Sequence, residues 1–431
     1  MMDEHFFFIG NQELNGIVRG RSVPSARRKS ALADGLPWVP ANITIGALNT
    51  LPPDNPFGPV GEIRLMPIAD ASITLEKVDE PTFDITLCEF AKSDGTPWAC
   101  CPRTVLKAAI DDLKTATGLT LKVAFEHEFT VSGLDVPTHI AFSPSAGRAG
   151  AVLAARVLAT LETGGFTLDQ FVAEYGPGQY EIAGQPTDAL AAADRTVLTL
   201  EAIRGLARDL GLHASFLPKR SSDLVGNGVH VHFSLWRDGR NVTVEDEWVS
   251  GEAGSFLAGM LEAADALTYL SVTSPNSFAR YRPQSWVGSF VCAGLRNREA
   301  MVRVVPRARD SHGAFPAASL EYRTSDATAN VYLMLAGIIR AGLDGIGHTL
   351  PPPTNIAQDP ATLDPETRSA MELRPLPTSP AELATDRVLE SVERWVGPEM
   401  TAAYASCRRN DQWHAEETDP DRLVEQLAVV Y

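Results

Sequence analysis

The chain has 431 residues, 44% of them hydrophobic, and a formal net charge of −17. This length and composition are typical of a globular protein with two domains. The excess of acidic side chains excludes an extended nucleic-acid surface, which needs clustered Lys and Arg. The N-terminus lacks the basic region of a signal peptide, and no apolar stretch approaches the roughly 20 residues of a membrane helix. Five cysteines without a CxxC pair fit a reducing compartment, so we expect a cytoplasmic protein without membrane or nucleic-acid partners.

The first 100 residues are punctuated by Gly and Pro and predict a small domain of strands and turns, with strand candidates at 63–68 and 83–87. A helix is predicted over 102–116, so we place the two domains at 1–100 and 101–431. In the second domain, caps and apolar spacing predict a helix from Thr187 or Asp188 to Leu210, before Gly211. A second helix is predicted over 330–340. The Pro-rich residues 347–387 are expected to run over the surface.

Three short strand-like segments each place two polar side chains at positions i and i+2, which share one face of a strand. The pairs are Glu126 and Glu128, His230 and His232, and Glu321 and Arg323. Each pair lies in apolar or β-branched sequence. A strand face made of acids and imidazoles favours a bound cation, because a cation offsets the desolvation of the acids. A solvated acidic edge strand remains the alternative for Glu126 and Glu128, and a satisfied core histidine for the His pair.

Glu174 and Glu181 flank a Gly-Pro-Gly turn. Seven residues is an odd spacing, so a regular strand would put the two carboxylates on opposite faces. The turn residues permit a change of register that brings them together. An ordinary hairpin loop is the alternative interpretation.

Several arginines follow, and Arg is the side chain best shaped for bidentate binding of carboxylate and phosphate. They are Arg280, Arg296, Arg298, Arg303 and Arg323. In so acidic a chain, this cluster favours an anionic ligand. Oxygen-rich sites with an imidazole suit Mg²⁺ or Mn²⁺, and metals combined with Arg indicate phosphoryl transfer. No GxxxxGK[ST] phosphate loop is present, so a nucleotide must bind in another way.

In combination these segments resemble the glutamine synthetase superfamily, over most of the chain. The matching motifs are Phe-Glu-x-Glu-Phe at 125–129, Glu-x-Gly-Pro-Gly-Gln-x-Glu at 174–181, Gly-x-Gly-x-His-x-His-x-Ser-Leu at 226–235, Asn-Ser-x-x-Arg at 276–280, Asn-Arg-x-x-x-x-Arg at 297–303 and Glu-x-Arg-x-x-Asp-x-x-x-Asn at 321–330. The resemblance implies an α+β protein. A small N-terminal β-grasp domain would precede a large catalytic domain with a curved antiparallel sheet and surrounding helices. It also implies ATP, two or three Mg²⁺ or Mn²⁺ ions per active site, and a homo-oligomeric ring, with a double-ring dodecamer expected.

The resemblance assigns roles to individual positions. Metal ligands would be Glu128, Glu174 and Glu181 for one ion, and Glu126, His230 and Glu321 for another. His232 and Ser234 would lie toward ATP, with Arg303 also near the nucleotide. Arg298, Arg303 and Arg323 would face the transferred phosphate, and Arg280 with the Gly228 backbone would hold the amino-acid substrate. The implied reaction activates the γ-carboxylate of glutamate with ATP as an acyl phosphate, which an amine attacks.

Two positions depart from the family pattern. An N-terminal Asp of the family that helps bind ammonium is replaced by Val39, and Trp286 occupies the place of a flap Glu. An ammonium pocket without acids would bury a cation unpaired. Apolar and aromatic side chains suit the carbon skeleton of an organic amine, and Trp adds a cation–π contact. The chain therefore resembles the branch that makes γ-glutamyl amides of polyamines and monoamines, and a monoamine or aromatic amine fits better than a polyamine.

Three alternatives remain open from the sequence. One is ammonia-dependent glutamine synthesis, which would need an acid supplied near Trp286 from elsewhere. Another is a catalytically silent homologue that acts as a nitrogen sensor, although such a protein would be expected to lose metal ligands. The third is ligation of an acid other than glutamate.

Overall fold

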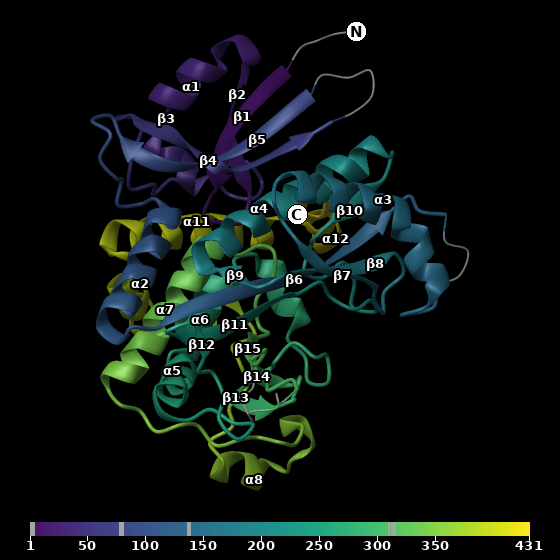
Figure 1. Ribbon diagram of the computed structural model, residues 1–431, viewed down its shortest axis with the longest axis vertical. Helices are drawn as coiled ribbons and strands as arrows, with labels where there is room; N and C mark the ends of the chain where they lie inside the picture. Colours follow the sequence, from purple (N-terminus) through teal and green to yellow (C-terminus); the bar gives the residue numbers. More distant parts are fainter. Residues whose placement is uncertain (1–4, 77–81, 136–138, 309–310, 312–315) are drawn as a thin grey trace.

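The computed structural model describes residues 5–76, 82–135, 139–308, 311 and 316–431 and confirms the α+β class, with two sheets (Figure 1). The first sheet has the strand order β2-β1-β5-β4-β3, with β1 and β5 parallel at its centre. Its strands are β1 (His5–Gln12), β2 (Val18–Pro24), β3 (Leu36–Trp38), β4 (Ile63–Leu75) and β5 (Thr82–Lys92). The helix α1 (Arg28–Asp34) and the 3₁₀ turns η1 (Ser25–Arg27) and η2 (Pro40–Thr44) lie between β2 and β4. This mixed sheet confirms the expected β-grasp architecture, and both strand candidates are longer than predicted.

The second sheet has ten strands and is mainly antiparallel, with the central order β13-β14-β15-β11-β6-β8-β7. These strands are β6 (Thr120–Ser132), β7 (Leu168–Ala173), β8 (Gln179–Gly184), β11 (Val229–Arg237), β13 (Phe290–Leu295), β14 (Ala300–Val305) and β15 (Ser319–Tyr322). The short strands β9 (Thr187–Asp188) and β10 (His213–Ser215) pair with β6, and β12 (Arg240–Asn241) pairs with β11. The central strands β6 and β11 thus carry two of the three predicted polar pairs.

Helices surround this sheet. They are α2 (Pro102–Thr117), α3 (Pro144–Thr163), α4 (Ala189–Asp209), α5 (Gly251–Glu262), α6 (Ala264–Ser271), α7 (Val331–Gly347), α8 (Pro365–Ala370), α9 (Pro380–Leu383), α10 (Asp386–Val396), α11 (Pro398–Glu417) and α12 (Pro420–Val430), with 3₁₀ turns η3 (Pro275–Arg280) and η4 (Pro360–Thr362). The helices predicted at 102–116 and 188–210 are present within about one residue. The helix expected over 330–340 continues to Gly347, because its buried apolar residues extend through Ile338, Ile339 and Ala341.

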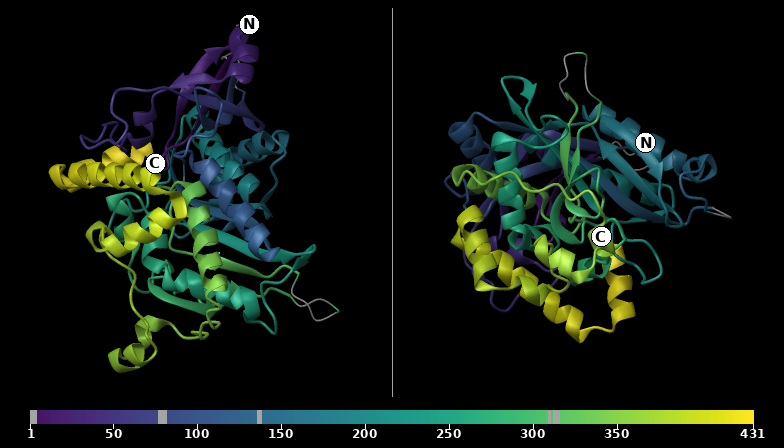
Figure 2. Two further views of the ribbon diagram at one scale, coloured as in Figure 1. Left: turned by 90° about the vertical axis from the view of Figure 1, so that its left-hand side faces the viewer. Right: turned by 90° about the horizontal axis from the view of Figure 1, so that it is seen from below.

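The two sheets are joined through packed helices and buried polar contacts. Helix α4 lies between them and contacts both β4 and β6. The Asn330 side chain, which caps α7, donates to the backbone carbonyls of Gln12 and Glu13 in the first domain. The helices α11 and α12, yellow in Figure 2, run beneath the first sheet, where the Tyr431 hydroxyl donates to the Asn15 carbonyl at 3.0 Å. These contacts fix one domain on the other.

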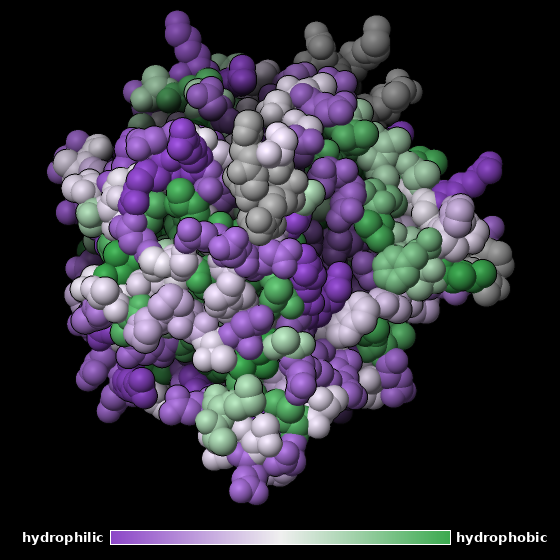
Figure 3. Space-filling model, turned by 60° about the horizontal axis from the view of Figure 1, so that its bottom comes forward, coloured by the Kyte–Doolittle hydropathy of each residue, from purple (hydrophilic) through white to green (hydrophobic). Residues whose placement is uncertain are grey.

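The Pro-rich segment runs over the surface, as predicted, and is tied to β13 by bridges from Phe290 to Pro375 and from Ala293 to Asn355. Within the part of the chain that the structure describes, no helix is long and apolar enough to cross a membrane. Hydrophilic residues dominate the face shown in Figure 3, but apolar side chains gather at its right-hand side, where Figure 1 places α3, β7 and β8. Ile140 and Phe142, just before α3, and Tyr175, just after β7, are exposed.

Candidate active site

The register of four neighbouring strands brings acids and imidazoles together on the second sheet. The residues opposite one another, in order across β8, β6, β11 and β15, are Glu181 and Glu128, Glu126 and His230, and His232 and Glu321. Because side chains alternate along a strand, each i, i+2 pair projects from the same face. The pairing therefore converts four separate sequence motifs into one diagonal row of ligand groups.

Glu174 joins this row from the loop between β7 and β8. Its backbone N–H donates to the Gln179 carbonyl at 2.9 Å, which closes the turn. Gly178 has φ +68°, and a Cβ there would collide with the Val131 carbonyl oxygen at 2.5 Å, so the turn requires glycine. Both Glu174 and Glu181 line the same cavity, despite the odd spacing between them.

This cavity has a volume of about 740 Å³, and most of the predicted charged residues line it. The predicted site residues that line it are Glu126, Glu128, Glu174, Glu181, His230, Arg280, Trp286, Arg298, Arg303, Glu321 and Arg323. Such a volume is large enough for a small-molecule ligand. Acids on the sheet and arginines from η3, the β13–β14 turn, β14 and the end of β15 therefore share one chamber.

The imidazoles and two of the carboxylates form a compact centre. Glu126 Oε2 lies 3.4 Å from His230 Nδ1, and Glu126 Oε1 lies 3.2 Å from His232 Nε2. Burial alone would raise the pKa of Glu126 and of Glu321, but the neighbouring imidazoles, and Arg323 beside Glu321, hold both values well below the usual range. Burial opposes the charged form of His232, yet Glu126 and Glu321 raise the pKa of His232 to about 9.

The other two acids of the row show the opposite behaviour. Burial and the nearby Glu128 raise the pKa of Glu174 to about 7, and burial with Glu126 and Glu128 raises that of Glu181 to about 9. A divalent cation beside Glu174 and Glu181 would offset both the burial of these carboxylates and their repulsion by neighbouring acids.

The donor atoms fit a hard divalent ion. Glu126, Glu181 and His230 form one group of ligand atoms within 4.8 Å of one another, and Glu126, His232 and Glu321 form a second. Glu321 Oε2 is buried and accepts no hydrogen bond, although it forms an ion pair with Arg303. Carboxylate oxygens with imidazole nitrogen suit Mg²⁺ or Mn²⁺. His232, which the resemblance assigned to the nucleotide, is thus placed as close to Glu126 as His230 is.

Arginines lie next to the acids. Arg303 and Arg323 both form ion pairs with Glu321. Arg280 is buried, donates to the Ser325 carbonyl at 3.1 Å and lies 3.5 Å from Asp326 Oδ2. The fixed guanidinium of Arg280 is therefore oriented for a carboxylate ligand.

Four predicted residues do not line the cavity. Gly228 lies just behind it, where its N–H donates to Glu128 Oε2 at 2.6 Å and a Cβ would overlap the Arg280 guanidinium. His232 and Ser234 are buried farther along β11. Val39 is exposed at the start of η2 in the first domain, on the other side of the molecule's domain junction. Its predicted role would require another subunit.

The mouth of the cavity contains an aromatic group, of which the sequence predicted only Trp286. Phe142 contacts Tyr175 edge to face at a centroid distance of 4.9 Å, and Tyr175 contacts Trp286 in the same way at 5.5 Å. All three line the cavity and are about half exposed. The Arg298 guanidinium lies over the Trp286 ring, 5.7 Å from its centroid. We call Phe142, Tyr175 and Trp286 the aromatic wall.

An acid does lie close to Trp286, which corrects the expectation from the sequence. The buried Glu299 accepts hydrogen bonds from the backbone N–H groups of Trp286 at 2.8 Å and Gln284 at 3.1 Å. It does not line the cavity. Gln284 and Trp286 have φ of +61° and +57°, a backbone conformation that the sequence does not signal. These two left-handed conformations turn the loop so that the backbone N–H groups of Gln284 and Trp286 face the Glu299 carboxylate.

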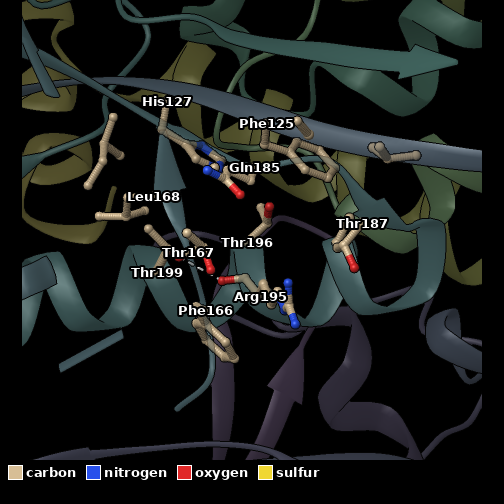
Figure 4. Close-up of a pocket in the computed structure, with 15 residues that line it drawn as sticks. Phe125, His127, Phe166, Thr167, Leu168, Gln185, Thr187, Arg195, Thr196 and Thr199 are labelled. Carbon is tan, nitrogen blue, oxygen red and sulfur yellow. Dashed lines mark hydrogen bonds between the residues drawn. The ribbon is translucent and has the colours of Figure 1, made fainter. Parts of the chain in front are cut away.

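The opposite face of β6 is packed and carries no comparable chamber in the described residues. A cavity of about 30 Å³ lies there, with room for roughly two water molecules. In Figure 4, His127 and Phe125 extend from β6 toward Arg195, Thr196 and Thr199 of α4. Burial and Arg204 lower the pKa of His127 to about 3, so this histidine is neutral. The charged chemistry is therefore concentrated on the other face of β6.

Known proteins give a consistent picture. The family model described as "Glutamine synthetase N-terminal domain" matches residues 6–98, and "Glutamine synthetase, catalytic domain" matches residues 99–424. The chain is 35% identical to a γ-glutamylpolyamine synthetase, GlnA3, of Streptomyces coelicolor, over 94% of this chain and 89% of that protein. It is 28% identical to a glutamine synthetase of Pyrococcus furiosus, over 89% and 83% of the two chains.

Solved structures agree with these matches. A glutamine synthase homologue superposes with a TM-score of 0.89 and 30% identity, covering 100% of this chain and 99% of the other. A complex of GmaS with ADP gives a TM-score of 0.81 and 25% identity, covering 97% and 95%. Together with the two family models, these likenesses establish that the chain belongs to the glutamine synthetase family.

Proposed function

We propose that the protein is an ATP-dependent ligase that joins the γ-carboxylate of glutamate to an organic amine through γ-glutamyl phosphate. The observation that carries the proposal is the single cavity in which a row of Glu and His side chains, five arginines and the aromatic wall meet. The relatives named as a γ-glutamylpolyamine synthetase and as GmaS support the same class of reaction.

The proposed first step transfers the terminal phosphoryl group of ATP to a γ-carboxylate oxygen and releases ADP. Arg298, Arg303 and Arg323 would neutralise charge on the moving phosphoryl group, which is the main requirement of such a transfer. The Glu and His row would hold two or three Mg²⁺ or Mn²⁺ ions, which supply charge neutralisation for the ATP phosphates when bound. His232 and Ser234 would lie toward the nucleotide.

Glutamate would be held from the other side. Arg280 is buried and fixed by the Ser325 carbonyl, and Gly228 leaves room beside the guanidinium. An α-carboxylate paired with this guanidinium would orient the substrate, with its side chain directed at the phosphate arginines.

In the second step the amine nitrogen attacks the γ-carbonyl carbon, phosphate leaves and the nitrogen loses a proton. Trp286 lines the cavity where an ammonium-specific site would need a carboxylate facing the acceptor. Glu299 bonds the Trp286 backbone from behind and does not supply that charge to the cavity. An organic amine is thus favoured over ammonium. By family likeness we also propose a ring-shaped homo-oligomer, a double-ring dodecamer, in which Val39 of a neighbouring subunit contributes to the acceptor site.

Phosphate release tests this proposal. The protein is incubated with ATP, Mg²⁺ and glutamate, and with ammonium, alkylamines, polyamines, ethanolamine or anilines as the acceptor. The products are identified by mass spectrometry. We expect release with organic amines and the mass of a γ-glutamyl amide. Equal turnover with ammonium would contradict the acceptor assignment. No release with any acid and amine would support the silent-sensor alternative.

A further inference from the structure

The mouth of the cavity combines features that select one kind of acceptor. We propose that the aromatic wall, held in shape by the buried carboxylate of Glu299, binds the apolar or aromatic carbon skeleton of a monoamine acceptor. This inference rests on the proposed function and assigns the substrate class and a positioning residue to its second step.

The first support is the exposure of the three aromatic side chains in the single chain. Phe142, Tyr175 and Trp286 are 53%, 49% and 48% exposed, yet they contact one another edge to face and line a cavity. Each comes from a different segment of the chain. Large aromatic side chains left half in water at a cavity mouth gain free energy when an apolar ligand covers them.

The second support is the position of the wall beside the reacting groups. The Trp286 carbonyl accepts from Arg323 Nη2 at 2.7 Å and from Nε at 3.2 Å. Arg298 lies over the Trp286 ring and so already places a cation against its π face. Two of the arginines proposed to hold the phosphoryl group therefore touch Trp286. An amine seated on the wall would be next to the acyl phosphate.

The third support is the charge around the mouth. Apart from the Glu row, the described residues that line the cavity include one acid, Asp223, against the cations Lys219, Arg282 and Arg298. A polyamine would bring several positive charges close to these cationic side chains, which would repel it. Exposed Leu224 and Val225, which also line the cavity, add apolar surface. A single amino group on an apolar skeleton meets these conditions.

Glu299 is the positioning residue of this subsite. Its two oxygens accept the N–H groups of Gln284 and Trp286, both of which have positive φ. Left-handed conformations of bulky residues persist only where surrounding contacts hold them. Without this carboxylate the loop would lose the two bonds that orient the indole.

The test compares acceptors of different size. Hydroxylamine traps an acyl phosphate without needing the wall, so hydroxamate formation measures the first step. Benzylamine, butylamine and spermidine measure the second. We expect Trp286→Ala to raise the KM for benzylamine about tenfold, and to lower hydroxamate formation by a clearly smaller factor, because the indole also packs against Arg298. We expect Trp286→Phe to raise the KM for benzylamine less than Trp286→Ala does. Trp413→Ala, at an exposed Trp outside the cavity, is the matched control and should behave as the wild type.

Glu299→Gln keeps one acceptor oxygen and should raise the KM for benzylamine several-fold without a matching change for hydroxylamine. Equal losses with both acceptors would mean that the loop serves the fold or the first step, and would overturn the inference. A wild-type preference for spermidine over benzylamine would also overturn it.

Binding gives a second measurement that does not depend on turnover. Benzylamine should quench tryptophan fluorescence saturably in the wild type and in Trp413→Phe, and this change should vanish in Trp286→Phe. If hydroxamate fails to form with any acid, the proposed function fails. The fluorescence titration then still decides the amine subsite, because quenching that persists in Trp286→Phe would contradict it.

Discussion

The two ends of the cavity are built by different means. At the inner end, Glu126, Glu128, His230 and Glu321 stand on paired strands, and the register of the sheet sets their positions. At the mouth, the aromatic wall lies on loops with positive-φ residues, and the Trp286 loop is held by two hydrogen bonds to Glu299 and two from Arg323. Strand pairing holds the side chains proposed to activate the acid in fixed positions, whereas loops carry the side chains proposed to select the acceptor. Substitutions at the inner end should therefore lower turnover with every acceptor. Substitutions at the mouth should lower turnover mainly with large acceptors.

Glu128→Gln is expected to have the largest effect. Replacing this carboxylate removes a negative charge from the row proposed to bind the metal, while the amide oxygen of Gln can still accept the Gly228 N–H bond. We expect hydroxamate formation and amine ligation to fall together by about 10³-fold or more, since metal-based neutralisation is worth several kcal/mol. Calorimetry of Mn²⁺ binding should show weakened affinity in parallel. Asp169→Asn, an exposed acid on β7, is the control. A loss confined to large amines would contradict the separation of the two ends.

Arg323→Lys comes next because this residue touches both ends. It pairs with Glu321 and also donates two hydrogen bonds to the Trp286 carbonyl. Lys cannot reproduce the bidentate geometry. We expect about a 10²-fold loss of hydroxamate formation, with a further loss for benzylamine. Steady-state kinetics with both acceptors separates the two parts. If the two losses were identical, the link from Arg323 to the wall would have no role in acceptor binding.

The sequence predicted the inner end well because local rules determine it. Alternation placed Glu126 and Glu128 on one face, and Gly178 explains how Glu174 and Glu181 meet. Across the molecule, the β-grasp sheet and the long helices were also predictable from motifs and periodicity. At the mouth only Trp286 was predicted, since its positive φ and the approach of Glu299 across 13 residues depend on loop conformation. Phe142 belongs to no motif and enters the wall through the contact with Tyr175.

Tyr175→Phe and Tyr175→Ala sharpen the contrast at the mouth. The edge-to-face contacts with Phe142 and Trp286 involve the ring. We expect Tyr175→Phe to change little and Tyr175→Ala to raise the KM for benzylamine about threefold to tenfold. Hydroxamate formation should be retained within about twofold in both variants. Loss of hydroxamate in Tyr175→Ala would show that the wall also supports the neighbouring Glu174, and the two ends would then be coupled.

The domain junction lies outside both ends and should change stability with little effect on turnover. Asp411 of α11 accepts the Ala47 N–H at 2.8 Å, and burial raises the pKa of its carboxyl from 3.8 to about 6, against the lowering effects of that hydrogen bond and of Arg19. Because the folded state binds this proton more tightly than the unfolded state, the contribution of Asp411 to stability falls as pH rises from about 4 to about 6. The fall should be on the order of 3 kcal/mol, at 1.36 kcal/mol for each unit of pKa difference.

Asp411→Asn keeps an oxygen for the Ala47 N–H and removes the titration. Urea unfolding of both proteins between pH 4 and pH 7 should give a difference in unfolding free energy that grows in favour of Asp411→Asn up to about pH 6 and is constant above it. Hydroxamate formation and benzylamine KM should match the wild type at pH 7. A pH-independent difference in stability would mean that Arg19 and Arg408 keep Asp411 charged in the folded protein throughout this range. An altered KM would instead show that the junction reaches the loops of the cavity mouth.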